Sequence, residues 1–170
     1  MRRISRAWAV SIATVAGVTG QPHTHVLHAA AVESPGKPGP VAEAVTLLGW
    51  FGDDVPRIEL AARRPPDASP TAEAWVRFNV DGSAMPVIYV ATDSSVYRGA
   101  ATMDYQALVK LAGILVHERW HLRHGQDEVG AYADQLGAME YLHASSLNLL
   151  GVRQALRWWQ QQAKQSAPAR

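Results

Sequence analysis

Residues 105–125 read YQALVKLAGILVHERWHLRHG, and this stretch decides the fold of the chain. Its apolar residues recur at the spacing of a helix that buries one face. Thr102 or Asp104 can cap the start of this helix, and Gly125 can end it. The sequence therefore predicts one long helix that packs against a core. Its apolar side comprises Tyr105, Leu108, Leu111, Ala112, Leu115 and Leu122.

The last turns of this helix contain the pattern H-E-x-x-H, formed by His117, Glu118 and His121. Residues four apart lie on one face of a helix, so both imidazoles can reach one metal ion. The glutamate between them can then act as a base on a water molecule at that ion. The alternative is a solvated helix end that is rich in His and Arg. The motif predicts a zinc hydrolase if a third ligand follows downstream.

The composition restricts the kinds of protein and of metal site that are possible. With 170 residues, 48% of them hydrophobic and 18% charged, the chain can form one globular domain with a core. The formal net charge is +1 and no basic cluster lies beyond Arg6, so we expect no nucleic-acid partner. The chain has no cysteine. Any metal must therefore be bound by His, Asp or Glu.

The N-terminal residues are typical of a signal peptide. A basic start with three arginines precedes an uncharged, apolar stretch at residues 7–20, which is too short to span a bilayer. We therefore expect export, to a secreted or periplasmic location, with cleavage after Gly20 or Ala31; a short anchor or an organellar presequence is the alternative. No later segment is predicted to span a membrane. The predicted organisation is a signal peptide at 1–31, a flexible leader at 32–40, one domain at 41–165 and a disordered tail at 166–170.

The region before the motif helix has the patterns of strands. Arg57 to Ala61 alternates polar and apolar residues, Ala74 to Val80 is rich in aromatic and β-branched residues, and Pro86 to Ala91 is the most apolar segment. Asp81-Gly82 predicts a turn between the second and third strands. We expect an α+β fold with a small antiparallel sheet, followed by the motif helix and two further helices. A short helix is also expected at Val41 to Trp50.

A catalytic zinc ion takes three protein ligands and leaves one position for water, so a third ligand is needed. His124 lies seven residues beyond His117, roughly 10 Å along the helix axis, and is too remote to share its ion. Asp127 and Glu128 both follow the Gly125 turn. Glu128 opens the next helix, where its side chain can face back towards the histidines. We favour Glu128 as the third ligand, and Asp127 is the alternative.

Two segments, Leu115 to Leu122 and Asp127 to Asp134, together resemble the zincin metallopeptidases, and more closely the gluzincin group. That group often carries its third ligand as E-x-x-A on a following helix, which Glu128-Val-Gly-Ala131 matches. The resemblance covers roughly residues 107–139. It implies a minimal zincin-like domain that binds one Zn²⁺ and hydrolyses peptide bonds. In this resemblance the zinc ligands are His117, His121 and Glu128, and the general base is Glu118.

The resemblance also has departures and further implications. Zincins usually have an uncharged residue at the position of Arg119 and an apolar residue at that of Arg123. An extended peptide or protein substrate is implied to pair with an edge strand, for which Val87 to Ala91 is the candidate. Tyr132, Tyr97 or His124 can stabilise an oxyanion, and Asp134 can accept the second N–H of a ligating imidazole.

Two other interpretations use the same residues. Glu118 and His121, with Glu140 and His143, repeat the Glu-x-x-His pattern of di-iron bundles, but such bundles need four long helices. A non-catalytic metal-binding or scaffold protein that retains the helix pair is the second alternative. The pair Trp158-Trp159 predicts either helix packing or a partner surface. The sequence does not indicate an oligomeric state.

Overall fold

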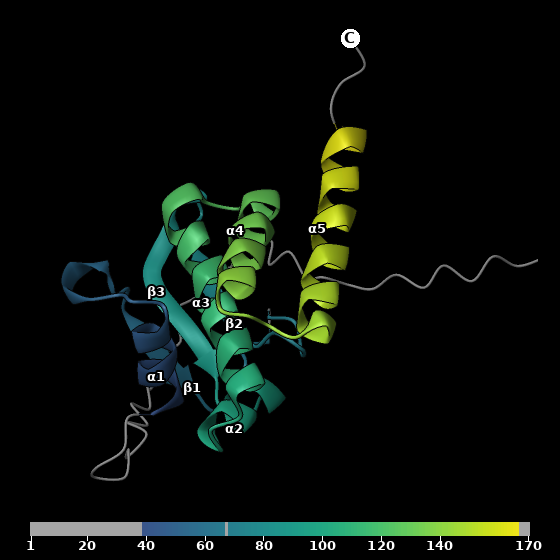
Figure 1. The fold of residues 1–170 in the computed structure, drawn as a ribbon. Coiled ribbons are helices and arrows are strands. Elements are labelled where there is room, and N and C mark those ends of the chain that lie inside the picture. The colour runs from purple at the N-terminus through teal and green to yellow at the C-terminus, as the bar shows by residue number, and fades with distance from the viewer. Residues whose placement is uncertain (1–38, 67, 167–170) are drawn as a thin grey trace, which may run out of the picture.

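The computed structural model describes residues 39–66 and 68–166. The predicted signal peptide, most of the predicted leader and residues 167–170 of the predicted tail lie outside the described residues. The described chain has an α+β fold with a small sheet and five α-helices (Figure 1). In chain order the elements are α1 (Pro40–Leu47), the 3₁₀ turn η1 (Gly52–Asp54), β1 (Ile58–Ala61), β2 (Ala74–Phe78), β3 (Ala84–Ala91), α2 (Ser95–Ala101), α3 (Tyr105–His124), α4 (Glu128–Tyr141) and α5 (Ser146–Ser166).

The sheet is mixed, so the prediction of a small antiparallel sheet is wrong in this respect while the α+β class is confirmed. Its strand order is β1-β3-β2, in which β3 pairs parallel with β1 and antiparallel with β2. The connection at residues 62–73 carries the chain from one edge of the sheet to the other. Parallel neighbours require such a long crossover, whereas antiparallel neighbours can be joined by a tight turn.

The turn between β2 and β3 forms where Asp81-Gly82 predicts it. The backbone N–H of Asn79 donates to the carbonyl of Ser83 at 2.8 Å, and Gly82 has φ = 81°. Glycine adopts this left-handed conformation without the steric cost that a side chain brings. The pairing with β3 is irregular between Val76 and Phe78. This irregularity lies in the strand that borders the candidate site.

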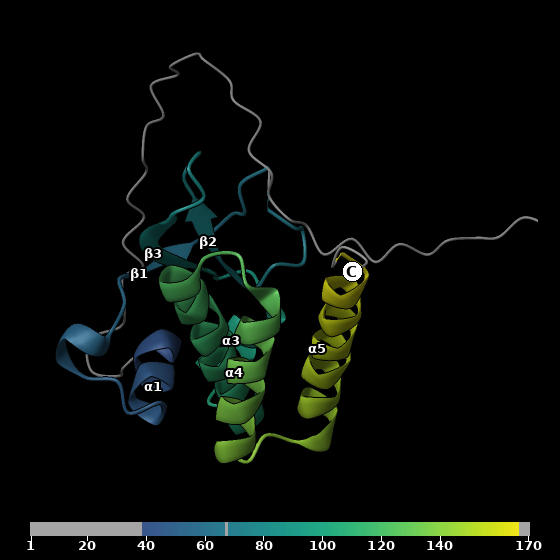
Figure 2. The ribbon, with the colours of Figure 1, turned by 90° about the horizontal axis from the view of Figure 1, so that it is seen from above.

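Helix α3 is the central element of the fold. It packs against β2 and β3 on one side and against α1, α2 and α4 on others, and Figure 2 shows the strands gathered on one side of the helices. The largest fully buried side chains come from the sheet and from α3 and α4; they are Ile88, Val90, Val109, Leu111, Leu115 and Met139. The burial of this apolar surface is the main force that fixes α3 against the sheet.

A glycine allows α3 and α4 to cross closely. A Cβ atom added at Gly113 would lie 2.5 Å from Cγ of Met139, a distance that real Cβ atoms do not show. The two helices are therefore in contact through backbone on one side and a fully buried methionine on the other. This close crossing brings the start of α4 beside the end of α3.

Two helices complete the description. Helix α2 is an addition to the predicted elements; it begins where the Ser94 side chain accepts a hydrogen bond from the N–H of Tyr97. Helix α5 lies on the far side of α4 (Figure 1), and Val152 is the one buried residue among its 21. Within residues 39–66 and 68–166, no helix combines the length and apolar character that crossing a membrane needs.

Candidate metal centre

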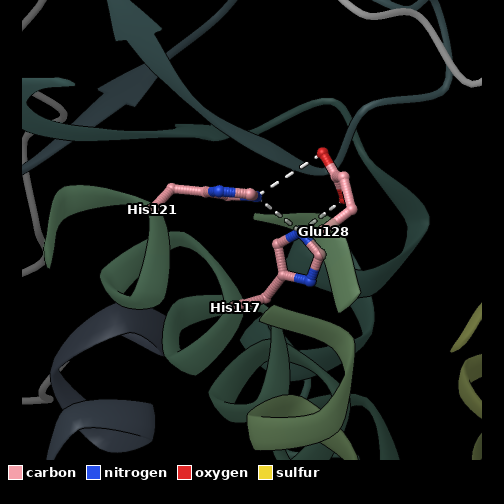
Figure 3. A group of neighbouring side chains, drawn as sticks. All are labelled: His117, His121 and Glu128. Carbon is pink, nitrogen blue, oxygen red and sulfur yellow. Dashed lines mark hydrogen bonds and ion pairs between the residues drawn. The ribbon is translucent and has the colours of Figure 1, made fainter. Parts of the chain in front are cut away.

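Helix α3 brings His117 and His121 to one point. The helix starts at the predicted cap, because the Asp104 carboxylate accepts hydrogen bonds from the N–H groups of Gln106 and Ala107. The two histidines lie one turn apart near its C-terminal end and are 8% and 5% exposed. Their Nε2 atoms are 3.1 Å apart (Figure 3).

Glu128 approaches the two imidazoles from the first turn of α4. Gly125 ends α3 with φ = 71° and so allows the chain to reverse within a few residues. The Glu128 carboxylate oxygens then lie 3.6 Å from Nε2 of His117 and 3.6 Å from Nε2 of His121 (Figure 3). One ligand atom from each residue lies within 4.8 Å of the others.

These separations fit a tetrahedral metal ion. Zinc binds histidine nitrogen and carboxylate oxygen at about 2.0–2.1 Å, which places two ligand atoms of a tetrahedron about 3.3 Å apart. The two imidazole Nε2 atoms are 3.1 Å apart, and each lies 3.6 Å from a different oxygen of the Glu128 carboxylate. With one carboxylate oxygen taken as the ligand atom, the three ligand atoms lie within 4.8 Å of one another. His117, His121 and Glu128 can therefore bind a metal ion, as their order in the sequence predicts.

The other two candidate ligands have different contacts. Asp127 caps α4: its carboxylate accepts from the N–H of Gly130 at 3.1 Å and from the Trp120 indole N–H at 3.3 Å. His124 is exposed and stacks on Trp120, with ring centroids 3.9 Å apart. The structure does not bring these two side chains into the His117–His121–Glu128 group.

The hydrogen bonds of His121 prepare its Nε2 for a metal. Its Nδ1 lies 2.7 Å from the carbonyl oxygen of Gly125. Because a carbonyl oxygen only accepts, Nδ1 carries the proton in this contact, which leaves Nε2 as the nitrogen that can act as a ligand on the side facing His117. For His121, the backbone carbonyl of Gly125 therefore takes the outer hydrogen bond for which Asp134 was a candidate.

The outer nitrogen of His117 has a different environment. Its Nδ1 is buried and has no hydrogen-bond partner within the described chain. Burial and the neighbouring His121 lower the pKa of His117 to about 3. The buried amide of Gln135, which is 6% exposed, opposes this shift by a smaller amount. Gln135 is therefore the candidate acceptor for Nδ1 of His117. His117 is therefore neutral at pH 7.

Gln135 is not among the residues that the motif predicts, although its position in the sequence relates it to Glu128. Gln135 lies seven residues beyond Glu128, and Tyr132 lies between them at the four-residue spacing, so all three side chains occupy the same face of α4. A buried glutamine in the middle of an amphipathic helix requires a polar partner. The helical spacing from Glu128, by four and then seven residues, therefore places Gln135 on the face of α4 that carries the third ligand.

Glu118 lies beside the ligand group in a buried position, with 8% of its surface exposed. Burial and the negative charge of Glu128 raise the pKa of Glu118 to about 8, and a hydrogen bond with the backbone of Val76 opposes that rise. Burial also raises the pKa of Glu128. Two carboxylates thus share a low-dielectric site in which their charged forms are disfavoured.

Tyr132 borders the same site, whereas Tyr97 and Asp134 do not. The Tyr132 ring lies 4.5 Å from that of His117, and burial and the nearby Glu128 raise the pKa of Tyr132 to about 12. Its hydroxyl is therefore a hydrogen-bond donor at neutral pH. Tyr97 packs against the core instead. Asp134 is exposed on α4.

The two arginines that depart from the zincin pattern point away from the ligand group. The Arg119 guanidinium lies 3.0 Å from the Asp54 carboxylate and 4.4 Å from the ring centre of Trp50. Arg123 reaches the same carboxylate at 3.8 Å. These contacts tie the segment after α1 to the outer face of α3. Asp54, which lies 65 positions before Arg119 in the chain, is therefore the shared partner of both arginines.

The group opens into a cleft of about 640 Å³ between β2, α3, α4 and α5. All five residues of β2 line it, together with the loop before β2. The prediction that the edge strand is Val87 to Ala91 is wrong, because β3 is the central strand and pairs on both sides. The apolar composition of β3 agrees with its central position, because its residues Val87, Ile88, Val90 and Ala91 are buried. The edge strand beside the site is β2.

The residues of the di-iron interpretation are not brought together. Glu140 forms an ion pair with Arg153 at 2.6 Å, and His143 is exposed beyond the end of α4. Within the described residues, one group of three or more potential ligands is present, and it contains neither of them. Comparison of the chain with models of protein families, with curated proteins and with solved structures found no match.

Proposed function

We propose that this protein is a zinc-dependent hydrolase that cleaves peptide bonds. His117, His121 and Glu128 would hold one zinc ion, and Glu118 would be the general base. The observation that carries the proposal is that the three ligand atoms and the buried carboxylate of Glu118 meet at one cleft beside a free strand edge. The resemblance to gluzincins in the sequence supports the same assignment.

The electrostatics of the ligand group support a bound cation. Burial lowers the pKa of His117 to about 3 and raises the pKa of Glu118 to about 8, and it also raises the pKa of Glu128, so burial disfavours the charged forms of these three side chains. A divalent cation needs the neutral imidazole and favours the ionised carboxylates. The set of two nitrogens and one oxygen is that of catalytic zinc sites, which keep a fourth position open.

The chemistry then follows from the positions of the side chains. A zinc ion bound at this site would supply the Lewis acidity that makes a water molecule more acidic and polarises the scissile carbonyl. Glu118 would accept the proton of the attacking water and deliver it to the leaving amine. Tyr132, which stays protonated, would donate a hydrogen bond to the developing oxyanion. The free edge of β2 would hold the substrate backbone in an extended form.

The test is the substitution Glu118→Gln in the full-length chain, with zinc content and cleavage of casein measured together. We expect the variant to bind zinc as the wild type does and to lose cleavage by about a hundredfold or more, because the base is removed while the ligands remain. Glu140→Gln is the matched control, since it removes an exposed carboxylate that does not line the cleft. Equal cleavage by wild type and Glu118→Gln would contradict the proposal. Zinc binding without cleavage by the wild type would favour a non-catalytic protein.

A further inference from the structure

One wall of the cleft is formed by helix α5, which lies outside the residues 107–139 that resemble zincins. Helix α5 lies beside α4 and packs mainly against it (Figures 1 and 2). Val152 is the one buried residue of α5, and several α5 residues line the cleft. One face of the helix lines the cleft at intervals of three and four residues. The α5 residues on this wall are Leu147, Asn148, Gly151, Val152, Ala155 and Trp159.

The chemistry of the α5 wall is apolar. Asn148 is the one polar side chain among the six, apart from the indole N–H of Trp159, and none of the six carries a charge. Opposite this wall, Lys110 and Glu73 form an ion pair at 3.0 Å, so their charges compensate one another. An occupant that lies against α5 therefore meets a mainly apolar surface, whereas the ionisable residues of the cleft come from β2, the loop before it, α3 and α4.

Two of the α5 residues that line the cleft, Gly151 and Ala155, are small and leave space in front of the helix. A Cβ atom added at Gly151 would meet no other atom within 4 Å. Ala155 lies one turn further and is also small, whereas Trp159 follows at the next turn with a large ring. Its indole Nε1 is buried and has no hydrogen-bond partner among the described residues.

The two sides of the cleft are complementary to different parts of one ligand. The outer edge of β2 pairs with no other strand among the described residues, and its backbone groups, apart from the one that Val76 gives to Glu118, can pair with an extended chain. The face of α5 offers a recess lined by apolar groups beside two small residues. A volume of about 640 Å³ is in the range of pockets that enclose small ligands, and it is large enough for an apolar side chain. The occupant that uses both walls is an extended peptide with a large apolar side chain.

We propose that α5 makes this site selective for extended peptides that carry a large apolar side chain near the scissile bond. Gly151 and Ala155 provide the space for that side chain, and Trp159 closes its end. The proposal rests on the proposed function for the position of the scissile bond. Binding of the side chain itself does not depend on catalysis, and the test uses this difference.

The experiment measures peptide binding to the full-length Glu118→Gln chain, loaded with zinc, by calorimetry. The ligands are blocked Ala- and Ser-based peptides in which one central residue is Ala, Phe, Trp or Asp. We expect the Phe and Trp peptides to bind about tenfold to a hundredfold more tightly than the Ala peptide, because burial of a large apolar side chain is favourable. Equal affinities for the Phe, Ala and Asp peptides would overturn the proposal.

Gly151→Leu, added to the same chain, tests the wall directly. The new side chain should occupy the recess and remove most of the preference for Phe and Trp. Gly137→Leu is the matched control, because Gly137 is a helical glycine on α4 with equally open surroundings and no place in the cleft. Gly151→Ala is a smaller step that raises helix propensity and should reduce the preference partly. An unchanged preference in folded Gly151→Leu would overturn the proposal.

The outcomes separate this inference from the proposed function. Preferential binding of Phe and Trp peptides by a protein whose wild type cleaves nothing supports the role of α5 and contradicts hydrolysis. Cleavage by the wild type at bonds beside Ala, Phe and Asp at equal rates supports hydrolysis and overturns the role of α5.

Discussion

The wall of the cleft that α3 and α4 form is packed and polar at its centre, whereas the wall that α5 forms is apolar and largely unpacked. Polar groups of the first wall, from His117 to Gln135, are buried and held by caps, a glycine turn and a close helix crossing. The second wall has one buried residue, Val152. Under the proposed function, the packed wall would fix the positions of the reacting groups and the open wall would leave space for a substrate side chain.

The contrast also explains which contacts determine stability. Met139 is fully buried where α4 crosses α3, and Leu147 on α5 is 79% exposed. Both are large apolar side chains, yet one is part of the core and the other is not. Removing each one measures how unequal the two walls are.

The largest effect is expected from Met139→Ala. The substitution leaves a cavity against Gly113 and should lower the free energy of unfolding by about 2–5 kcal/mol. Leu147→Ala is the matched change on the other wall and should alter it by less than about 0.5 kcal/mol. Urea unfolding followed by circular dichroism measures both. Equal losses in the two variants would contradict the distinction between a packed wall and an open one.

A smaller effect, confined to the packed wall, is expected from Gln135→Leu. We expect zinc affinity to fall about tenfold to a hundredfold, because the variant removes the buried amide that can serve as an acceptor for Nδ1 of His117 once the metal is bound. Gln135→Glu retains an acceptor and should bind zinc at least as tightly as the wild type. Competition with a chromogenic chelator measures the affinity in each variant. If Gln135→Leu binds zinc as the wild type does, Gln135 has no positioning role.

The sequence predicts the features that are local in the chain. The helix at residues 105–124, its Asp104 cap and the Gly125 end follow from spacing and from residue preference, and they place His117, His121 and Glu128 together. Each of these inferences needs only neighbours within about eleven positions. Helical geometry converts such short separations directly into distances.

The features that the sequence does not predict depend on contacts between distant segments. The strand order is one, since the periodicity of a strand gives its faces but not its neighbours. The partner of Arg119 is another, because Asp54 lies 65 positions away. The α5 wall is a third: the amphipathic pattern of α5 indicates an apolar face but not that this face borders a cleft.

The most direct test of the central claim is the zinc content of three purified proteins: the wild type, Glu128→Ala and Asp127→Ala. We predict about one zinc ion per chain in the wild type and in Asp127→Ala, and loss of zinc in Glu128→Ala, because Glu128 supplies the third ligand. Asp127→Ala should lose about 1 kcal/mol of stability through its helix cap and keep the metal. A wild type without zinc, or zinc lost from Asp127→Ala and retained by Glu128→Ala, would contradict the metal centre described here.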